Sequence, residues 1–289
     1  MNSPGLACGK LPNSLLHEIL NMDGPTPPGI LLPPRIGEDA GVIALAEGAL
    51  VVASDPVTMT GSNVGAHAVI VNANDVAVSG VRPRWFLATI LLPEGTTEND
   101  VRTLYEGMQK MLDKHDILLV GGHSEITSSV TQVVVSGHML GFASDGAYMR
   151  TGDMVEGDTI LQIGPAAVEA AAVIANELPN SQDLVSNSTW TSAQSAFNKP
   201  GISVIESALN SAVLGAHAMH DPTEGGLSAG LHEMASASNL AVHIDTENIL
   251  WFEPGISLCN SLGADPWGSL ASGALLAAFP KELSSKAHA

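Results

Sequence analysis

The apolar residues follow two different periods along the chain, and together these periods predict a protein of mixed strands and helices. Apolar residues spaced three or four apart predict helices at 14–20, 64–79, 97–115, 166–177, 202–218 and 226–238. Short runs rich in Val, Ile and Leu predict strands at 41–45, 50–54, 84–92, 117–120, 131–141, 159–163, 240–244 and 272–279. Because strands and helices alternate in both halves, the fold class is expected to be α/β (α+β).

Some segments carry more specific predictions. The strands at 41–45 and 50–54 are joined by Glu47-Gly48, so they are expected to form a hairpin. The helix at 64–79 is apolar on nearly every side, and the strand at 117–120 is wholly apolar. We therefore expect both to be buried.

Two segments are expected to be loops, and one region is expected to separate two domains. Residues 24–34 are rich in Pro and Gly, and residues 179–200 are mostly polar, so neither favours regular structure. Gly-Asp occurs twice between residues 150 and 158, in a stretch that resembles a connector. The expected domains are therefore 1–153 and 154–289.

Composition excludes several classes of function. The chain has 11 basic and 30 acidic residues among its 289, a net charge of −19. Nucleic acids and anionic membranes need a basic surface, so neither is an expected partner. A hydrophobic content of 45% with 14% charged residues excludes a disordered chain.

The cysteines and the N-terminus favour the cytoplasm. Cys8 and Cys259 are far apart and form no CxxC motif, so neither a disulfide framework nor a cysteine-rich zinc site is expected. No secretory signal is recognisable, and no apolar run approaches the ~18 residues of a membrane helix. We expect a soluble cytoplasmic protein.

Acidic turn motifs flank the predicted hairpin. Gly37-Glu38-Asp39-Ala40 precedes it and Ser54-Asp55-Pro56 follows it. In a hairpin that turns near Glu47, opposite residues have numbers that sum to about 94, which puts Asp39 beside Asp55. Two carboxylates side by side are destabilising unless a cation lies between them. The alternative is two ordinary turn aspartates exposed to water.

The apolar helix carries a third acidic motif. Ala68, Asn72, Asp75 and Ser79 follow helical spacing and share one face. Burying Asn72 and Asp75 is costly unless each has a partner, and a metal ion is one such partner. A neighbouring helix N-terminus is the alternative.

Two glycine-containing motifs complete the set. Gly121-Gly122-His123-Ser124-Glu125 follows a predicted strand, where glycines allow a ligand to approach the backbone. Asp221-Pro222-Thr223-Glu224-Gly225-Gly226 precedes a predicted helix, whose N-terminus would favour an anion. A plain turn in the first case and a side-chain cap from Thr223 or Asp221 in the second are the alternatives.

The charges of these motifs indicate what kind of ligand they could bind together. Glycine turns and helix N-termini suit phosphates, but the surrounding carboxylates would repel a polyphosphate. Mg²⁺ resolves the conflict because it bridges carboxylates and phosphate oxygens. The chain has no GxxxxGK[ST] motif and no GxGxxG after a strand, so neither a P-loop nor a dinucleotide fingerprint supports a different nucleotide site. His220, beside Asp221, is a candidate proton carrier.

In this order, the motifs resemble those of the superfamily of aminoimidazole ribonucleotide (AIR) synthase, selenophosphate synthetase, thiamine-monophosphate kinase and the HypE-like hydrogenase-maturation proteins. The segments that carry the resemblance are 37–40, 54–55, 71–83, 121–125 and 221–227. Residues 84–89 and 92–95 are most similar to the HypE-like, AIR synthase-related members.

The resemblance implies a two-domain AIR synthase-like fold, with the N-terminal halves of two subunits paired in a barrel-like dimer core. It implies that ATP binds at the dimer interface through Mg²⁺ and activates an amide-type oxygen by phosphorylation. The implied magnesium residues are Asp39, Asp55, Asp75 and Asp221. The implied nucleotide-binding residues are Asn72, Gly121, Gly122, Gly225 and Gly226, and the candidate catalytic residues are Asp75, His220 and Glu125.

The sequence constrains the partners and the pathway less than it constrains the fold and the site. The expected partners are a second copy of the chain, a small-molecule or carbamoylated protein substrate and a maturation protein. HypE-type chains end in a Cys, whereas this sequence ends in Ala287-His288-Ala289, and we expect the C-terminal domain to be truncated. A non-catalytic nucleotide-binding accessory protein and a purine-pathway cyclo-ligase are the alternative functions.

Overall fold

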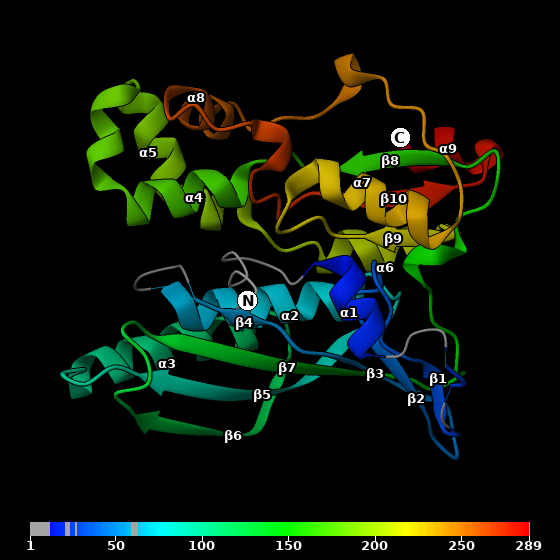
Figure 1. Cartoon of the computed structure of the whole chain (residues 1–289), viewed down its shortest axis with the longest axis horizontal. Helices are drawn as coiled ribbons and strands as arrows, with labels where there is room; N and C mark the ends of the chain where they lie inside the picture. The colour runs from blue at the N-terminus through cyan, green and yellow to red at the C-terminus, as the bar shows by residue number, and fades with distance from the viewer. Residues whose placement is uncertain (1–11, 21–23, 27, 59–62, 289) are drawn as a thin grey trace, which may run out of the picture.

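The computed structural model describes residues 12–20, 24–26, 28–58 and 63–288, and it contains two sheets with helices between and around them (Figure 1). The large sheet has the strand order β1-β2-β3-β7-β5-β6, with β4 also paired to β7. Among the strand pairs of the described residues, β5 and β6 alone run parallel. The strands are β1 (Ile30–Leu32), β2 (Gly41–Ala44), β3 (Ala49–Ala53), β4 (Pro56–Val57), β5 (Pro83–Leu92), β6 (Leu118–Ile126) and β7 (Val134–Ala143).

The small sheet belongs to the C-terminal half. Its order is β8-β10-β9, and both pairings are antiparallel. Its strands are β8 (Thr159–Ile163), β9 (Ala218–His220) and β10 (Leu275–Phe279). The α/β (α+β) class expected from the sequence is confirmed.

Helix α2 (Val64–Ala77) is the central element of the fold. Every one of its residues is buried. It packs on β3, β7 and the amphipathic helix α3 (Glu98–Lys114), and α6 (Ile205–Val213) of the C-terminal half covers it from the other side. Figure 1 shows α2 between the large sheet and the C-terminal half. Its all-round apolar sequence follows from this position.

Two polar side chains of α2 anchor the C-terminal half. The amide of Asn74 donates to the carbonyl of Ile202 and accepts from the N–H of Val204, each over 2.9 Å. His67 Nε2 lies 2.8 Å from Glu169 Oε1 on α4 (Val168–Glu177), and both residues are buried. The two halves therefore share a buried polar interface.

The remaining helices are peripheral, and several sequence predictions concern them. The helix expected at 14–20 is α1 (Asn13–Ile19), and Thr97 caps α3 with the reciprocal bonds of a capping box. The helices not yet given are α5 (Asn187–Ser195), α7 (Gly226–Ala237), α8 (Glu253–Ser261) and α9 (Lys281–His288). None of the helices in the part of the chain that is described is long and apolar enough to span a membrane.

Several local predictions were wrong. The loop expected at 24–34 contains β1, and the loop expected at 179–200 contains a 3₁₀ turn followed by α5. The helix expected at 202–218 ends at Val213, because Gly215 adopts a positive φ and the chain then enters β9. Helix α8 was not predicted at all.

Two predicted strands also differ from the structure. The run at 117–120 is not buried: only Ile117 is, and the exposed strand β6 forms the edge of the large sheet. The segment 240–244 forms no strand and no helix in the structure, so the strand predicted there is wrong. An apolar run alone therefore decided neither the burial of the first segment nor the backbone structure of the second.

Candidate nucleotide site

A carboxylate–imidazole–carboxylate chain joins the two halves. His220, at the end of β9, is buried, and its Nδ1 lies 2.7 Å from Asp39 Oδ2. Its Nε2 lies 2.9 Å from Glu233 Oε2 on α7. Burial alone would lower the pKa of His220, but these two carboxylates outweigh it and raise the pKa to about 10. His220 is therefore an imidazolium that donates from both nitrogens.

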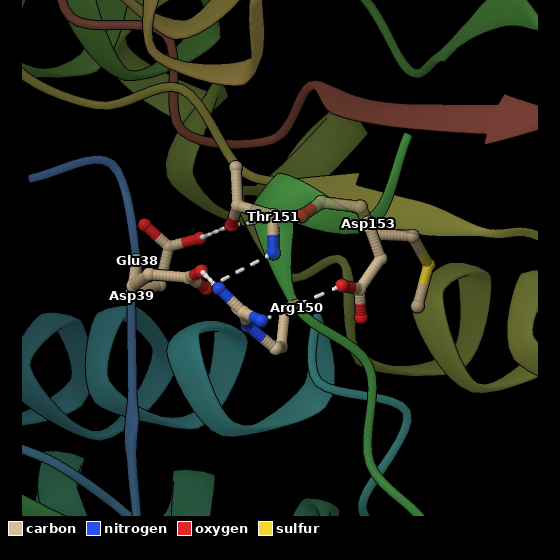
Figure 2. A network of polar contacts seen from close by, with 6 residues as sticks. Glu38, Asp39, Arg150, Thr151 and Asp153 are labelled. Atoms are coloured by element: carbon tan, nitrogen blue, oxygen red, sulfur yellow. Dashed lines mark hydrogen bonds and ion pairs between the residues drawn. The ribbon is translucent and has the colours of Figure 1, made fainter. Parts of the chain in front are cut away.

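A second network fixes the segment that carries Asp39 (Figure 2). Glu38 accepts from Nε and Nη2 of Arg150, at 3.3 and 3.2 Å, and from the backbone N–H of Thr151 at 3.1 Å. Burial raises the pKa of Glu38, and Arg150 opposes that rise. The Thr151 hydroxyl lies 3.4 Å from Asp39 Oδ2 and 3.2 Å from the carbonyl of Met219. The connector between the halves thus orients Asp39.

Asp221 is the most unusual side chain of the site. It is 2% exposed, and neither of its carboxylate oxygens has a hydrogen-bond partner. Burial raises its pKa well above the ordinary value, and the nearby carboxylates of Asp39 and Asp55 raise it further, while His220 lowers it. A buried carboxylate without a donor is costly, and a cation is the group that would satisfy it.

Asn72 and Asp75 present polar groups from α2 to the same region. The Asn72 side chain accepts from the N–H of Asp55 at 2.8 Å and donates to the Asp55 carbonyl at 3.1 Å. Asn72 therefore holds the backbone of Asp55, a role that the sequence did not predict. Asp75 is buried and lines a small cavity of about 10 Å³ with Glu38 and Asp39, enough for about one water molecule.

The hairpin of β2 and β3 differs in register by one residue from the sequence prediction. Gly41 lies opposite Val52, where the prediction puts it opposite Ala53. Asp39 and Asp55 both influence the buried Asp221 electrostatically. Because Asp221 comes from the C-terminal half, the acidic group is built from both halves of the chain.

The glycines before α7 are required by the backbone. Gly225 precedes the helix with a φ of +85°, and no side chain caps the helix. Gly226 has a φ of +67°, and an added Cβ would collide with the carbonyl oxygens of Trp267 and Ser269. The side-chain cap considered as an alternative is therefore absent, and the helix begins on two glycines beside Asp221.

The glycine motif on β6 lies apart from these residues. Gly121, Gly122 and Glu125 are exposed on the outer strand of the large sheet. Glu125 pairs with His123 at 3.1 Å, and the two glycines line a cavity of about 420 Å³ against α3. No described contact joins Glu125 to the acidic group within one chain.

The residues fit a magnesium–phosphate complex better than an all-protein metal site. Within the described ranges, no three His, Cys, Asp or Glu side chains are arranged to hold a metal ion by themselves. Mg²⁺ usually binds to one or two carboxylates and fills its other positions with water and phosphate oxygens. The two unpartnered oxygens of Asp221 are suited to such an ion.

Sequence reasoning missed several residues of the site. Glu233, Arg150 and Thr151 were not predicted to take part. Glu233 follows Gly226 by seven residues, which is about two helical turns, so the two residues lie on the same face of α7. This spacing was a usable signal that Glu233 takes part in the site. Arg150 and Thr151 carried no recognisable pattern.

Sequence profiles of known families match most of the chain. Residues 37–143 match the profile described as AIR synthase related protein, N-terminal domain, and residues 155–289 match the corresponding C-terminal domain. The chain therefore belongs to the AIR synthase related protein family.

Individual relatives point to one branch of that family. A putative hydrogenase expression/formation protein of Methanocaldococcus jannaschii is 27% identical over 227 residues, which cover 78% of this chain and 65% of the relative. The carbamoyl dehydratase HypE of Rhizobium leguminosarum bv. viciae is 26% identical and is matched over 96% of this chain and 77% of its own length. The chain spans about two thirds of the first relative.

Solved structures share the fold. The HypE–HypF complex has a TM-score of 0.73 at 21% identity, covering 95% of this chain and 87% of that one. HypE in complex with ATP has a TM-score of 0.72 at 22% identity, with coverages of 88% and 76%. AaThiL complexed with AMPPCP and TMP has a TM-score of 0.73 at 20% identity, with coverages of 93% and 84%. The AIR synthase-like fold expected from the motifs is confirmed.

Proposed function

We propose that this chain is a Mg²⁺- and ATP-dependent dehydratase of the HypE-like group, which activates an amide-type oxygen by phosphorylation during hydrogenase maturation. The observation that carries the proposal is the buried carboxylate of Asp221, whose two oxygens lack partners beside Asp39 and Asp55. The names of the relatives, carbamoyl dehydratase and hydrogenase formation protein, support the reaction class.

In this proposal, Asp39, Asp55, Asp75 and Asp221 hold magnesium directly or through water. When bound, the ion neutralises the phosphate charge that these carboxylates would otherwise repel. Asn72 fixes the backbone that carries Asp55, and Glu38 with Arg150 fixes the segment that carries Asp39. Such support keeps the carboxylates in place when no nucleotide is bound.

We assign His220 a positioning role in place of the proton-carrier role expected from the sequence. Both of its nitrogens donate to carboxylates, so neither is free to accept a proton near neutral pH. Its positive charge holds Asp39 beside Asp221 and reduces the repulsion within the acidic group.

The N-terminus of α7 is the proposed phosphate contact. Gly225 and Gly226 let the first turn of this twelve-residue helix lie beside Asp221 without a side chain in between. The N–H groups and the dipole of a helix N-terminus favour an anion. A phosphate held there is within reach of an ion on the acidic group.

We further propose that two copies pair through β6 and that the partner subunit completes the nucleotide pocket with Gly121, Gly122 and Glu125. An exposed apolar edge strand is a template for pairing with another chain. On β6, the exposed fractions of Leu118, Val120 and Ile126 are 63%, 53% and 52%. The separation of Glu125 from the acidic group in one chain is consistent with a site shared between subunits.

The proposed domain division is 1–153 and 154–289. It assigns Asp39, Asp55 and Asp75 to the first domain and His220 and Asp221 to the second. The acidic group then lies where the two domains meet.

A product assay tests the proposed reaction. The chain is incubated with ATP, Mg²⁺ and a peptide bearing S-carbamoylcysteine, and ADP, phosphate, AMP and the mass of the peptide are measured. The proposal predicts ADP and phosphate, together with a peptide lighter by one water. Formation of AMP would contradict it. Tight ATP binding without turnover would instead support the non-catalytic accessory protein, and turnover with formylglycinamidine ribotide would support the cyclo-ligase.

A further inference from the structure

A second buried polar cluster lies between the two halves, outside the acidic group. It consists of His67 on α2, Glu169 in the first turn of α4 and Ser272 in the segment before β10. Their exposed fractions are 3%, 6% and 1%. His67 Nε2 lies 2.8 Å from Glu169 Oε1, and the backbone N–H of Ser272 donates to Glu169 Oε2 over 3.3 Å. Glu169 therefore holds both of the other residues.

Two buried polar atoms of this cluster have no hydrogen-bond partner within the described chain. They are Nδ1 of His67 and the hydroxyl oxygen of Ser272. Buried polar atoms are normally hydrogen-bonded, so this pair indicates a place for a polar group of a ligand. A proton on Nδ1 would be a buried donor without an acceptor, so we expect His67 to carry its proton on Nε2 and to donate it to Glu169. Nδ1 can then accept a proton.

A short stretch of chain connects the cluster to the proposed phosphate contact. At one end of this stretch, the carbonyl oxygen of Ser269 lies 2.5 Å from the place where a Cβ of Gly226 would stand, at the start of α7. At the other end, Ser272 contacts Glu169. Three residues of chain span at most ~10 Å. A substrate group that reaches a phosphate at α7 is therefore close to the cluster.

The proposed reaction needs a base near that phosphate. When the oxygen of a carbamoyl group, –S–C(=O)–NH₂, attacks the γ-phosphate of ATP, an O–P bond forms and ADP leaves. The amide nitrogen loses one proton in this step as the C=N bond forms. The second N–H proton leaves with the phosphate when the C–O bond breaks, and a nitrile remains.

The candidate proton acceptors from the sequence do not suit this step within one chain. Both nitrogens of His220 are bonded to carboxylates. Glu125 is exposed on β6, and no described contact joins it to the acidic group. His67 is buried, has an unpartnered ring nitrogen and is held by a carboxylate, which are the properties of a base in a His–carboxylate pair.

We propose that His67 takes the first proton from the amide nitrogen of the substrate, with Glu169 as its positioning residue and the hydroxyl of Ser272 as a donor to the same amide group. The inference rests on the proposed function and assigns the residues that hold the reacting amide. The amide enters between the two halves, beside residues 269–272. Its N–H meets Nδ1 of His67 while its oxygen reaches the phosphate at α7.

Matched histidine variants test the proposal. His67→Gln keeps a nitrogen that can donate to Glu169, but it has no group that accepts a proton. The control is His217→Asn, because Nδ1 of His217 also lies 3.0 Å from a carboxylate, that of Asp158, outside the cluster. Each protein is assayed with ATP, Mg²⁺ and the S-carbamoylcysteine peptide, and its ATP affinity and melting temperature are measured in parallel.

The two variants are expected to differ in rate but not in nucleotide binding. His67→Gln should slow dehydration of the peptide by ~10²- to 10⁴-fold with unchanged ATP affinity, and His217→Asn should leave the rate unchanged. If the wild-type chain and His67→Gln dehydrate the peptide equally fast, the role of His67 is overturned and the proposed function stands. If the wild-type chain binds ATP but yields no dehydrated peptide, the proposed function is overturned and the role of His67 falls with it.

A measurement on the wild-type chain applies even if His67→Gln does not fold. Nitrogen NMR of a chain with ¹⁵N-labelled histidine reports which ring nitrogen carries the proton. The His67 signals are assigned through the Phe197 ring, whose centroid lies 5.3 Å from that of His67. We expect a proton on Nε2 and none on Nδ1 at pH 7. A protonated Nδ1 would overturn the proposal.

Discussion

The imidazole of His220 donates a hydrogen bond from Nδ1 to Oδ2 of Asp39 over 2.7 Å, although 181 positions separate the two residues in the sequence. Asp39 belongs to the connection between β1 and β2, and His220 ends β9 in the C-terminal half. The bond therefore joins the two acidic motifs that lie farthest apart in the chain. It also places a positive charge directly beside the carboxylates that are proposed to hold magnesium.

The unpartnered carboxylate of Asp221 should destabilise the chain when metal is absent. We expect Asp221→Asn to raise the free energy of unfolding in EDTA by about 1–3 kcal/mol, because it removes a buried charge that has no donor. Burial raises the pKa of Asp221 in the folded state well above its unfolded value of about 3.8, so the carboxyl begins to destabilise the fold as pH rises through 3.8. The gain from Asp221→Asn should therefore grow with pH until the raised folded-state pKa is reached.

Urea denaturation at several pH values measures this effect. Asp183→Asn, at an exposed carboxylate outside the acidic group, is the control and should change stability by less than about 0.5 kcal/mol. The variant at Asp221 should also lose the stabilisation that Mg²⁺ and ATP give the wild-type chain. A less stable Asp221→Asn protein in EDTA would refute the interpretation of an unsatisfied charge.

Two glycines with nearly equal φ angles allow the cost of backbone strain to be measured separately from the cost of a steric collision. Gly226 and Gly263 have φ values of +67° and +69°, but only Gly226 has neighbours where a Cβ would stand. Gly263→Ala should cost about 1–2 kcal/mol from the left-handed conformation alone. Gly226→Ala should cost about 1–3 kcal/mol more, because it also forces Trp267 and Ser269 apart. Thermal and urea denaturation compare the two, and equal losses would argue against close packing at Gly226.

The buried pair between α2 and α4 should make stability depend on acid pH. Burial opposes ionisation of Glu169, but the hydrogen bonds from His67 and Ser272 outweigh it and lower its pKa below 4.5. A lowered carboxyl pKa contributes stability that is present above pH 4.5 and is lost as pH falls through the lowered value. Glu169→Gln should therefore cost about 3–5 kcal/mol at pH 7 and progressively less below pH 4.5.

Glu206→Gln is the control for the buried pair. Glu206 forms an ion pair with Arg82 over 2.8 Å, but its side chain is 63% exposed, so its loss should cost no more than about 1 kcal/mol. Denaturation curves at pH 3, 5 and 7 compare the variants. A cost for Glu169→Gln that does not shrink in acid would contradict the assigned ionisation.

Pairing through β6 predicts a specific change of oligomeric state. Val120→Lys places a charge on the exposed apolar edge and should convert a dimer into a monomer at micromolar concentration. Val213→Lys, at an equally apolar and more exposed position on α6, should leave the dimer intact. Analytical ultracentrifugation measures both. A wild-type monomer, or a dimer that survives Val120→Lys, would exclude this interface.

The sequence predicted the elements whose apolar pattern depends on their own residues. The all-round apolar pattern of residues 64–79 is that of the buried α2. Patterns that depend on neighbours were misread. Residues 118–120 have the composition of a buried strand but lie exposed at the edge of the sheet. The prediction failed because the pattern of residues within a strand does not reveal whether another strand lies beside it.

In the candidate site, too, the sequence revealed residues with a local pattern and missed residues that act through distant contacts. Acidic residues close to Gly or Pro turns were recognisable, and Asp39 and Asp55 both raise the pKa of Asp221. Arg150 and Thr151, which position Asp39, were not recognisable, because each acts across more than a hundred residues of chain. Glu233 was also missed, although its spacing from Gly226 on α7 was a usable signal. The role of His220 could not be predicted either, because its positive charge results from contacts with the carboxylates of Asp39 and Glu233.

Calorimetric titration of ATP into the chain, with Mg²⁺ and again with EDTA, tests the central claim most directly. The account predicts binding that requires Mg²⁺ and that Asp75→Asn weakens by ~10- to 100-fold while the circular dichroism spectrum and melting behaviour stay close to those of the wild type. Equal affinity with Mg²⁺ and with EDTA, or undiminished affinity in the Asp75→Asn protein, would contradict it.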